Sequence, residues 1–505
     1  MLLGIALAAW ACVRLGIHVY NYLTFPLPLD DGEGHVLNQA VLISSGKLPY
    51  LPISQPPYIV TNYPPLFASL AALFFPLAGN YYLTAGVSVF PGLIITRLIS
   101  VLSGLGIAFL IYKIALKSGA NRDYAAIASL LFLAMPLVYF WFPIGKPDML
   151  ALFLGLLGFY LGVIWLDRGI TFYLSLIPLI LAVFTRQSEI APFLALFIVL
   201  LIRKDKRAVV FILSYAVSIV AITFILQAVT GGEYLKHIVT YTKTQFYLAR
   251  LWTTWSFFFQ YFSLALIVSF YFLVKKFIKK EFSPPLLYFF FAVLISLTSG
   301  KVGSDMNYFL ETIIAGQIIL ALFLTELSKE TLRQTGMAIA SVLVFLIAFD
   351  FAFLHDNRAY SYDPIRKPIK QGESTDIEFA SVLVSFIKQQ PGKILSEDEA
   401  FPAICRKEVI FNPFIMSELS KEGLWDQTDF VESIKNQEYD LIILRFLVTN
   451  PNNEDKPSRG GYAGWDRWTE EMEQAIKENY NNFAVIPLRR QWYIYYPNKE
   501  KPESK

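Results

Sequence analysis

Three carboxylates lie within four residues, just after the first apolar stretch of the chain, in Leu29-Asp30-Asp31-Gly32-Glu33-Gly34-His35. If a helix begins here, Asp30 and Glu33 are spaced i to i+3 and share one face. Carboxylates at a membrane boundary are costly to desolvate, so they usually line a hydrated cavity and act there. Asp30, Asp31 and Glu33 could supply a general base toward a hydroxyl or an amine, or could hold a divalent cation. A solvated acidic loop is the structural alternative.

Two other segments place charged residues at the ends of apolar stretches. In Gly145-Lys146-Pro147-Asp148, Asp148 could be a second acid facing the same cavity, or it could cap the following helix. In Thr185-Arg186-Gln187-Ser188-Glu189, Arg186 offers a guanidinium suited to a phosphate or pyrophosphate, or it could pair with Glu189. Both interpretations stay open for each residue.

Lys301 and Arg97 are the remaining candidate cations. Lys301 begins the segment Lys301-Val302-Gly303-Ser304-Asp305-Met306-Asn307-Tyr308 and could bind a lipid phosphate, although a solvated loop lysine fits equally well. Arg97 lies within an apolar stretch, where snorkelling or pairing with a neighbouring helix competes with ligand binding. The four histidines show no metal-ligand spacing, so a histidine-based zinc site is weakly supported.

The composition is that of a polytopic membrane protein. The chain has 505 residues, of which 55% are hydrophobic and 16% are charged, whereas soluble domains carry about 25% charged residues. No basic run with interleaved aromatic residues suggests nucleic-acid binding. The two cysteines, Cys12 and Cys405, fall in different environments, so we expect neither a disulfide nor a thiolate metal site.

Apolar stretches long enough to cross a bilayer recur about eleven times. Some of them are short for a straight crossing, so we expect these to be tilted or broken. The stretches fall near 2–24, 90–112, 124–142, 148–166, 171–185, 188–202, 208–229, 255–274, 285–299, 308–325 and 335–354.

The charges divide the chain into two parts. Residues 1–354 hold 23 Lys and Arg against 15 Asp and Glu, whereas residues 355–505 hold 20 against 25. We therefore expect a transmembrane module at 1–354 and a separate water-soluble domain at 355–505. Fourteen basic residues gather in alternate loops, and the positive-inside rule makes these loops cytoplasmic. The acidic stretch and the C-terminal domain would then face the outside of the plasma membrane.

Residues 25–89 form one long outer loop in this topology. The apolar run from Pro64 to Gly79 is short, begins with two prolines and contains Pro76. We therefore expect a juxtamembrane or re-entrant helix there rather than a crossing. Loops of this length are uncommon without a functional reason.

The C-terminal part alternates strand-like and helix-like segments, which predicts a small α/β domain. It shows no glycine-rich phosphate loop and no catalytic triad pattern, so the sequence supports only an accessory or acceptor-side role. The expected strands are 393–396, 409–411, 439–444 and 492–496, and the expected helices are 375–389, 427–436 and 467–480.

Five motifs follow one another in residues 1–355 and share one side of the predicted membrane. They are the acidic stretch, the pair 45–50 and 61–66, and the segments 145–152, 185–187 and 303–309. Together they resemble the GT-C superfamily of integral membrane glycosyltransferases, especially prokaryotic members related to the protein mannosyltransferases and aminoarabinose transferases.

The resemblance implies a polytopic GT-C fold that transfers a sugar from a polyprenyl-phosphate-linked donor to an extracytoplasmic acceptor, with inversion at the anomeric carbon. It also implies an essential acid in the first outer loop, a role that falls on Asp30 or Asp31 with Glu33 as partner. The common pattern is an adjacent Asp-Glu pair, which this chain replaces with Asp-Asp-Gly-Glu, so the identity of the base stays open. The remaining candidates follow from charge and position. Asp148 and Asp305 are expected at a second acidic or acceptor site, Arg186, Lys301 and Arg97 at the donor phosphate, and Tyr63, Gln187, Asn307 and Tyr308 at the substrate.

Two other classes of function are compatible with these features. A transporter or flippase for a lipid-linked or small polar substrate would also carry intramembrane charges and broken spans, although the chain has no two-fold repeat. A non-enzymatic envelope-assembly protein would use the acidic loop only structurally. No cofactor is certain, and a role for a divalent metal stays open.

Overall fold

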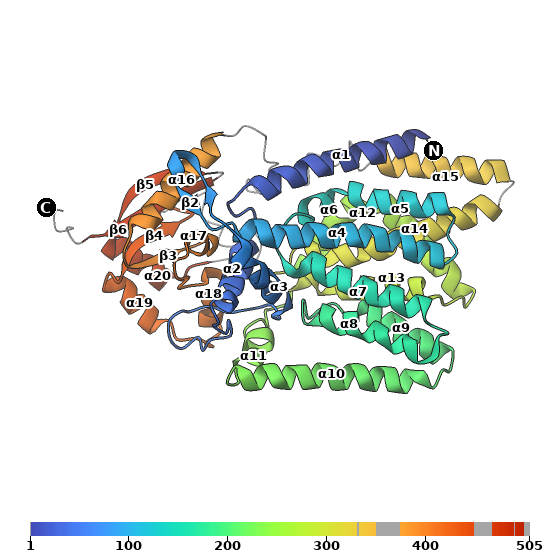
Figure 1. The fold of residues 1–505 in the computed structure, drawn as a ribbon, viewed down its shortest axis with the longest axis horizontal. Coiled ribbons are helices and arrows are strands. Elements are labelled where there is room, and N and C mark those ends of the chain that lie inside the picture. The colour runs from blue at the N-terminus through green and yellow to red at the C-terminus, as the bar shows by residue number, and fades with distance from the viewer. Residues whose placement is uncertain (1, 331–332, 350–373, 449–466, 489, 499–505) are drawn as a thin grey trace.

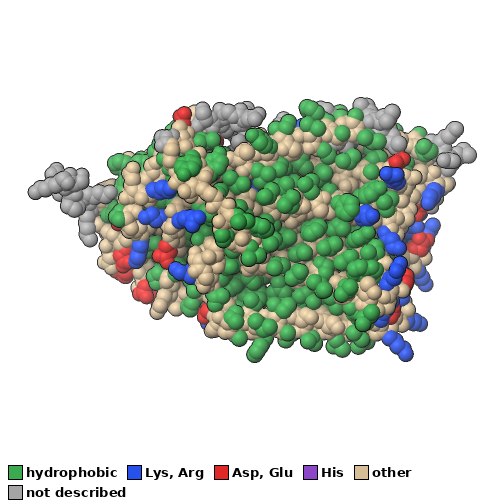
Figure 2. Space-filling model, in the orientation of Figure 1, with side chains coloured by type: hydrophobic (Ala, Val, Ile, Leu, Met, Phe, Trp, Pro, Cys, Tyr) green, Lys and Arg blue, Asp and Glu red, His purple; other side chains and the backbone are tan. Residues whose placement is uncertain are grey.

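The computed structural model describes residues 2–330, 333–349, 374–448, 467–488 and 490–498. A bundle of long helices forms one part of the molecule, and a mixed α/β region lies at one end of that bundle (Figure 1). Lys and Arg side chains gather at the opposite end of the bundle, and a broad apolar surface separates the two ends (Figure 2). The basic loops and the α/β region therefore lie on opposite sides of the apolar part, as the charge pattern predicts.

Helices occupy every apolar stretch that the sequence suggests. Pro136 divides the expected segment 124–142 into two helices, because its ring and missing N–H interrupt the backbone pattern. The helices of this part are α1 (Leu2–Thr24), α4 (Gly92–Lys117), α5 (Arg122–Ala134), α6 (Pro136–Trp141), α7 (Pro147–Ile164), α8 (Leu176–Val183), α9 (Ala191–Ile202), α10 (Arg207–Val229), α11 (Glu233–Leu235), α12 (Leu248–Ile278), α13 (Pro284–Ser296), α14 (Leu310–Glu330) and α15 (Arg333–Phe349).

The expected number of about eleven crossings is not confirmed. Among the described residues, four helices are individually long and apolar enough to cross a membrane. α12 becomes a fifth if its two halves, which meet at an angle of 103°, form one broken span. The non-helical backbone of Phe262 marks the bend. Helices α8, α9 and α13 belong to shorter apolar segments that lie against these longer ones.

The segment 25–89 contains two helices and a small hairpin. α2 (Asp31–Ser44) packs on α3 (Leu66–Phe74), and β1 (Tyr81–Tyr82) pairs with β2 (Ser88–Val89). With the 3-10 turn Phe75–Leu77, the apolar helix at α3 has twelve residues. Such a helix is about 18 Å long, whereas the hydrocarbon core is about 30 Å thick. Its length therefore agrees with a helix that does not cross.

The C-terminal region is built on a four-stranded sheet of order β3-β4-β6-β5, in which only β3 and β4 are parallel. The predicted domain boundary at 354/355 falls outside the described residues and stays a prediction. The elements of the region are α16 (Ser374–Gln389), β3 (Lys393–Ser396), α17 (Ala400–Ile404), α18 (Pro413–Lys421), α19 (Thr428–Lys435), β4 (Tyr439–Leu444), α20 (Glu470–Asn479), β5 (Tyr480–Leu488) and β6 (Arg490–Pro497).

Two details of this region differ from the sequence-based expectation. Residues 409–411 do not join the sheet; instead Phe411 forms an isolated parallel bridge with Tyr58 of the N-terminal half. Strand β5 was not predicted, because its side chains are mostly exposed and polar at its start, and its first residue overlaps the helix expected at 467–480.

Candidate functional site

The acidic stretch begins α2. The Asp30 side chain caps the helix, with its Oδ1 atom accepting a hydrogen bond of 2.9 Å from the backbone N–H of Gly32. Asp31 and Glu33 lie in the first turn, where the partial positive charge of the helix N-terminus favours carboxylates. Of the two alternatives that the sequence left open, a helix start and a solvated loop, the structure has the helix start, and the three carboxylates have three different sets of partners.

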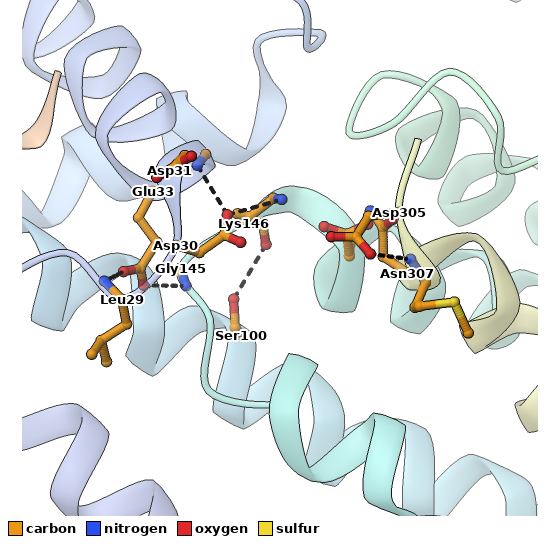
Figure 3. Close-up of polar contacts among 12 residues, drawn as sticks. Leu29, Asp30, Asp31, Glu33, Ser100, Gly145, Lys146, Asp305 and Asn307 are labelled. Atoms are coloured by element: carbon orange, nitrogen blue, oxygen red, sulfur yellow. Dashed lines mark hydrogen bonds and ion pairs between the residues drawn. The ribbon is translucent and has the colours of Figure 1, made fainter. Parts of the chain in front are cut away.

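Glu33 and Arg97 form a fully buried pair. Both guanidinium nitrogens facing Glu33, Nε and Nη2, lie 2.7 Å from its carboxylate oxygens. The same carboxylate accepts hydrogen bonds from the backbone N–H groups of Leu29 and Gly145 (Figure 3). The remaining N–H groups of Arg97 donate to the backbone carbonyls of residues 22, 25 and 27. All five donors of the guanidinium are thus directed at protein acceptors.

Asp30 pairs with Lys146, whose ammonium nitrogen lies 3.1 Å from Asp30 Oδ1. Burial alone would lower the pKa of Lys146, but the nearby charges of Asp30, Asp148 and Asp305 outweigh it and raise the pKa, so the side chain stays an ammonium. Its nitrogen also lies 4.7 Å from the ring centre of Trp141. Figure 3 shows the end of Lys146 on the side of Asp30 that faces Asp305 and Asn307.

Asp31 faces the C-terminal region instead. Its carboxylate accepts two hydrogen bonds from the guanidinium of Arg445. Arg467 donates a further bond of 2.5 Å. Asp31 is the most exposed of the three carboxylates, with 39% of its side chain accessible.

A second charged group surrounds Asp148 at the start of α7. Its Oδ1 atom accepts a hydrogen bond of 2.7 Å from the Asn307 side-chain amide and lies 3.3 Å from Arg186. Arg186 also pairs with Glu189 at 3.2 Å and stacks over the ring of Tyr308, 4.8 Å from the centroid. The pairing of Arg186 with Glu189, one of the two alternatives that the sequence left open, is therefore present, and phosphate binding by Arg186 stays a prediction.

Tyr63 connects the two groups. It is partly buried, and the charges of Lys146, Asp148 and Arg186 all act on its hydroxyl. Burial raises the pKa of Tyr63, so its hydroxyl stays protonated and can donate a hydrogen bond. Asp30, Lys146, Asp148 and Arg186 therefore belong to one connected set of charges at the end of the helices nearest the α/β region.

The remaining predicted residues lie around this set. Asp305 caps a 3-10 turn through the backbone N–H of Met306 at 2.7 Å and interacts with Lys146. Gln187 donates a hydrogen bond to the carbonyl of Asn62 in the 25–89 segment. In the described part of the chain, the Lys301 side chain makes no ion pair or hydrogen bond with these residues, and it is partly exposed.

Two glycines allow the close packing of this site. A Cβ atom on Gly145 would lie 2.3 Å from the Thr96 hydroxyl oxygen, so only glycine lets this loop approach α4. A Cβ atom on Gly32 would lie 2.9 Å from Cε of Lys146, which would crowd the lysine beside Asp30. The glycines that flank the charged residues therefore help to bring Asp30, Glu33 and Lys146 together.

Among the described residues, no group of three His, Cys, Asp or Glu side chains is arranged to hold a metal ion. The cations next to the carboxylates are Lys and Arg side chains.

Sequence reasoning did not select four residues that the structure brings into or next to the site. Lys146 lies in the segment 145–148, two residues before Asp148. A rule that pairs each candidate acid with the nearest basic residue would have selected it. Glu189 was considered only as a partner of Arg186. Arg445 and Arg467 carry no sequence signal, because they are separated from Asp31 by 414 and 436 residues.

The fold of this chain is similar to the folds of solved structures of ArnT and of an archaeal oligosaccharyltransferase. No protein-family model matches the chain, and no curated protein matches it by sequence. The fold, in contrast, is shared with a solved structure along almost the whole chain, so the fold that the motif resemblance implies is confirmed.

The particular structures include ArnT from Cupriavidus metallidurans bound to undecaprenyl phosphate, with a TM-score of 0.59, 14% identity and coverage of 97% of both chains. The Archaeoglobus fulgidus oligosaccharyltransferase in its apo form has a TM-score of 0.56 and 10% identity, covering 87% of this chain and 69% of that one. The same organism's AglB, in complex with an inhibitory peptide and a dolichol-phosphate, has a TM-score of 0.51 and 10% identity.

Proposed function

We propose that this chain is a membrane glycosyltransferase that moves a sugar from a polyprenyl-phosphate-linked donor to an extracytoplasmic acceptor. The observation that carries the proposal is the fold likeness to ArnT bound to undecaprenyl phosphate, which extends over 97% of both chains. The connected set of acids and cations at the end of the apolar helices supports it. A lipid-linked donor keeps its phosphate at the bilayer surface, so residues at that depth can meet it without extracting the lipid.

Asp30 is the best candidate for the general base. Glu33 uses both oxygens to hold Arg97 and two backbone N–H groups and is fully buried. Asp31 is held by two arginines of the C-terminal region. Asp30 instead lies beside Lys146, which interacts with both Asp148 and Asp305. We therefore assign a positioning role to Glu33 and Arg97 rather than a catalytic or phosphate-binding one.

The proposed reaction is a single displacement. The base removes a proton from the hydroxyl or amine of the acceptor. At the same time the oxygen or nitrogen of the acceptor forms a bond to the anomeric carbon of the sugar. The bond between that carbon and the phosphate oxygen breaks, and the lipid phosphate leaves with the electron pair. Lys146 and Arg186 would stabilise its developing negative charge. Attack from the face opposite the leaving group inverts the anomeric centre.

The test uses the full-length chain in lipid nanodiscs with undecaprenyl-phosphate-linked sugars, each offered with extracts of envelope glycans, lipids and proteins as acceptors. We expect sugar transfer by the wild type and a loss of about tenfold or more in kcat/KM for Lys146→Gln, because a charged hydrogen bond to the donor is removed. Lys421→Gln, which changes an exposed surface lysine, is the control and should retain full activity.

Two results would contradict the proposal. Absence of transfer from every donor would remove it, and uptake or flipping of a substrate without any transferred sugar would favour the transporter. Reporter fusions at Gln55 and Asp205 test the proposed orientation, in which Gln55 is outside and Asp205 is cytoplasmic.

A further inference from the structure

The arginine that holds Asp31 is itself fixed within the C-terminal region. Arg445 follows β4, and its side chain is only 5% exposed. Its guanidinium lies 3.1 Å from Asp398 and 5.1 Å from the ring centre of Trp492. Its backbone N–H donates a 2.8 Å hydrogen bond to Glu397. Arg445 therefore presents its N–H groups to Asp31 from a pre-arranged position.

The C-terminal region also contacts the next turn of α2 directly. A Cβ atom on Gly34 would lie 2.3 Å from the backbone nitrogen of Ala400, so α2 and α17 touch at backbone distance. His35, one residue later, lies 3.4 Å from Glu399 and 3.2 Å from the Asn412 amide nitrogen. The first turn of α2 is thus embedded in the C-terminal region, whereas Asp30 at its cap faces Lys146.

Backbone hydrogen bonds dock this region on both sides of α2 independently of Arg445. Tyr58 donates to the carbonyl of Ile410 at 2.7 Å and accepts from Asn412 at 3.0 Å. Phe90 donates to the carbonyl of Ile404 at 2.8 Å. Because these bonds remain when Arg445 is replaced, the replacement removes the charge contact to α2 without detaching the C-terminal region.

We propose that Arg445, supported by Arg467, is a positioning residue through which the C-terminal region fixes the first turn of α2 and so holds Asp30 against Lys146. The effect on catalysis rests on the proposed function, but the effect on α2 does not. Arg445 acts on the reaction only through Asp31. The C-terminal region is therefore part of the machinery that orients the catalytic carboxylate, rather than a separate accessory domain.

Amide hydrogen exchange on the full-length chain in nanodiscs tests the structural part. Arg445→Gln should speed exchange of the amides of residues 32–36 at least tenfold. Asp31→Asn, which breaks the same contact from the helix side, should do the same. Arg445→Lys keeps the charge without the two-pronged geometry, so it should restore part of the protection. Arg406→Gln is the control, because Arg406 packs over Phe90 at 4.4 Å without touching α2.

Kinetics of sugar transfer test the catalytic part. Arg445→Gln and Asp31→Asn should each lower kcat about tenfold with little change in the KM for the donor, and the double variant should be no slower than either. Unchanged exchange in both single variants would overturn the inference. So would a loss confined to Asp31→Asn with full activity in Arg445→Gln, which would make Asp31 the base. Faster exchange in a chain without transfer activity would sustain the positioning role while rejecting the proposed function.

Discussion

Glu33 and Asp30 are three residues apart in one turn of chain, and each is paired with a basic side chain, yet the two pairs differ in how completely they are satisfied. Glu33 and Arg97 are both 0% exposed, and every guanidinium donor has a protein acceptor. Asp30 and Lys146 have side chains that are 9% and 11% exposed. Lys146 also interacts with acids on two other elements.

This difference in burial and hydrogen bonding distinguishes a pair that stabilises the structure from a pair that can bind a substrate. A buried pair with all of its hydrogen bonds made is costly to disturb and has no capacity left for a substrate. The Asp30–Lys146 pair is slightly exposed, and its ammonium is shared among several acids. Such an ammonium can exchange one carboxylate partner for a phosphate. The difference supports the proposal that Glu33 and Arg97 stabilise the fold and that Asp30 and Lys146 take part in the reaction.

The strongest challenge to this comparison is Asp30→Asn. Asparagine keeps the size of the side chain and can still cap α2, but it cannot accept a proton. We expect kcat to fall by about 10²–10⁴-fold, the usual contribution of a general base, with an unchanged unfolding temperature. Steady-state transfer assays measure the loss, and Asp429→Asn, an exposed site in α19, serves as the control. Activity near that of the wild type would move the base elsewhere.

Glu33→Gln tests the holding pair. It leaves the guanidinium of Arg97 buried without a counter-charge, and breaking one partner of a buried pair typically costs about 3–5 kcal/mol. Thermal or denaturant unfolding in detergent should show the loss. Glu432→Gln breaks an exposed pair with Lys435, and its effect should stay below about 1 kcal/mol. If the two variants were equally stable, the Glu33 pair would not be structural.

Gly34→Ala separates the docking of α2 from its charges. The new Cβ atom would overlap the backbone nitrogen of Ala400 at 2.3 Å, so we expect a destabilisation of about 1–3 kcal/mol and a lower kcat. Gly79→Ala, in the same segment but with nothing within 4 Å, should change neither quantity. Unfolding curves and transfer rates of the two variants make the comparison.

The smallest effect concerns pH. Burial raises the pKa of Asp398 to about 7, although Arg445 opposes the shift, whereas an unfolded chain has a value of about 3.9. Between these values the folded state binds the proton more tightly, so stability falls as pH rises from about 4 to about 7. The melting temperature should drop by about 2–4 °C from pH 5 to pH 7.5. Asp398→Asn should flatten this slope, and an equal slope in both proteins would refute the assignment.

Local patterns account for much of the fold. Apolar stretches located the helices of the bundle except the short α11, and residues 393–396 and 439–444 form strands with the predicted bounds. Other features depend on contacts between distant segments. Residues 409–411 have a strand-like composition, but their partner is Tyr58. The three acids of the first motif look alike in sequence, and only Arg97, Lys146 and Arg445 give them different roles.

The bridge between Tyr58 and Phe411 has a consequence for biosynthesis. The segment 25–89 is made well before its partners in the C-terminal region, which lie up to 436 residues further along the chain. Early domains commonly fold while the rest of the chain is still being synthesised, but here the segment 25–89 has to wait until its partners up to Arg467 have been made. The acidic motif therefore acquires its final arrangement late, so a chain that ends before residue 400 would insert its helices while the proposed reaction centre stayed unassembled.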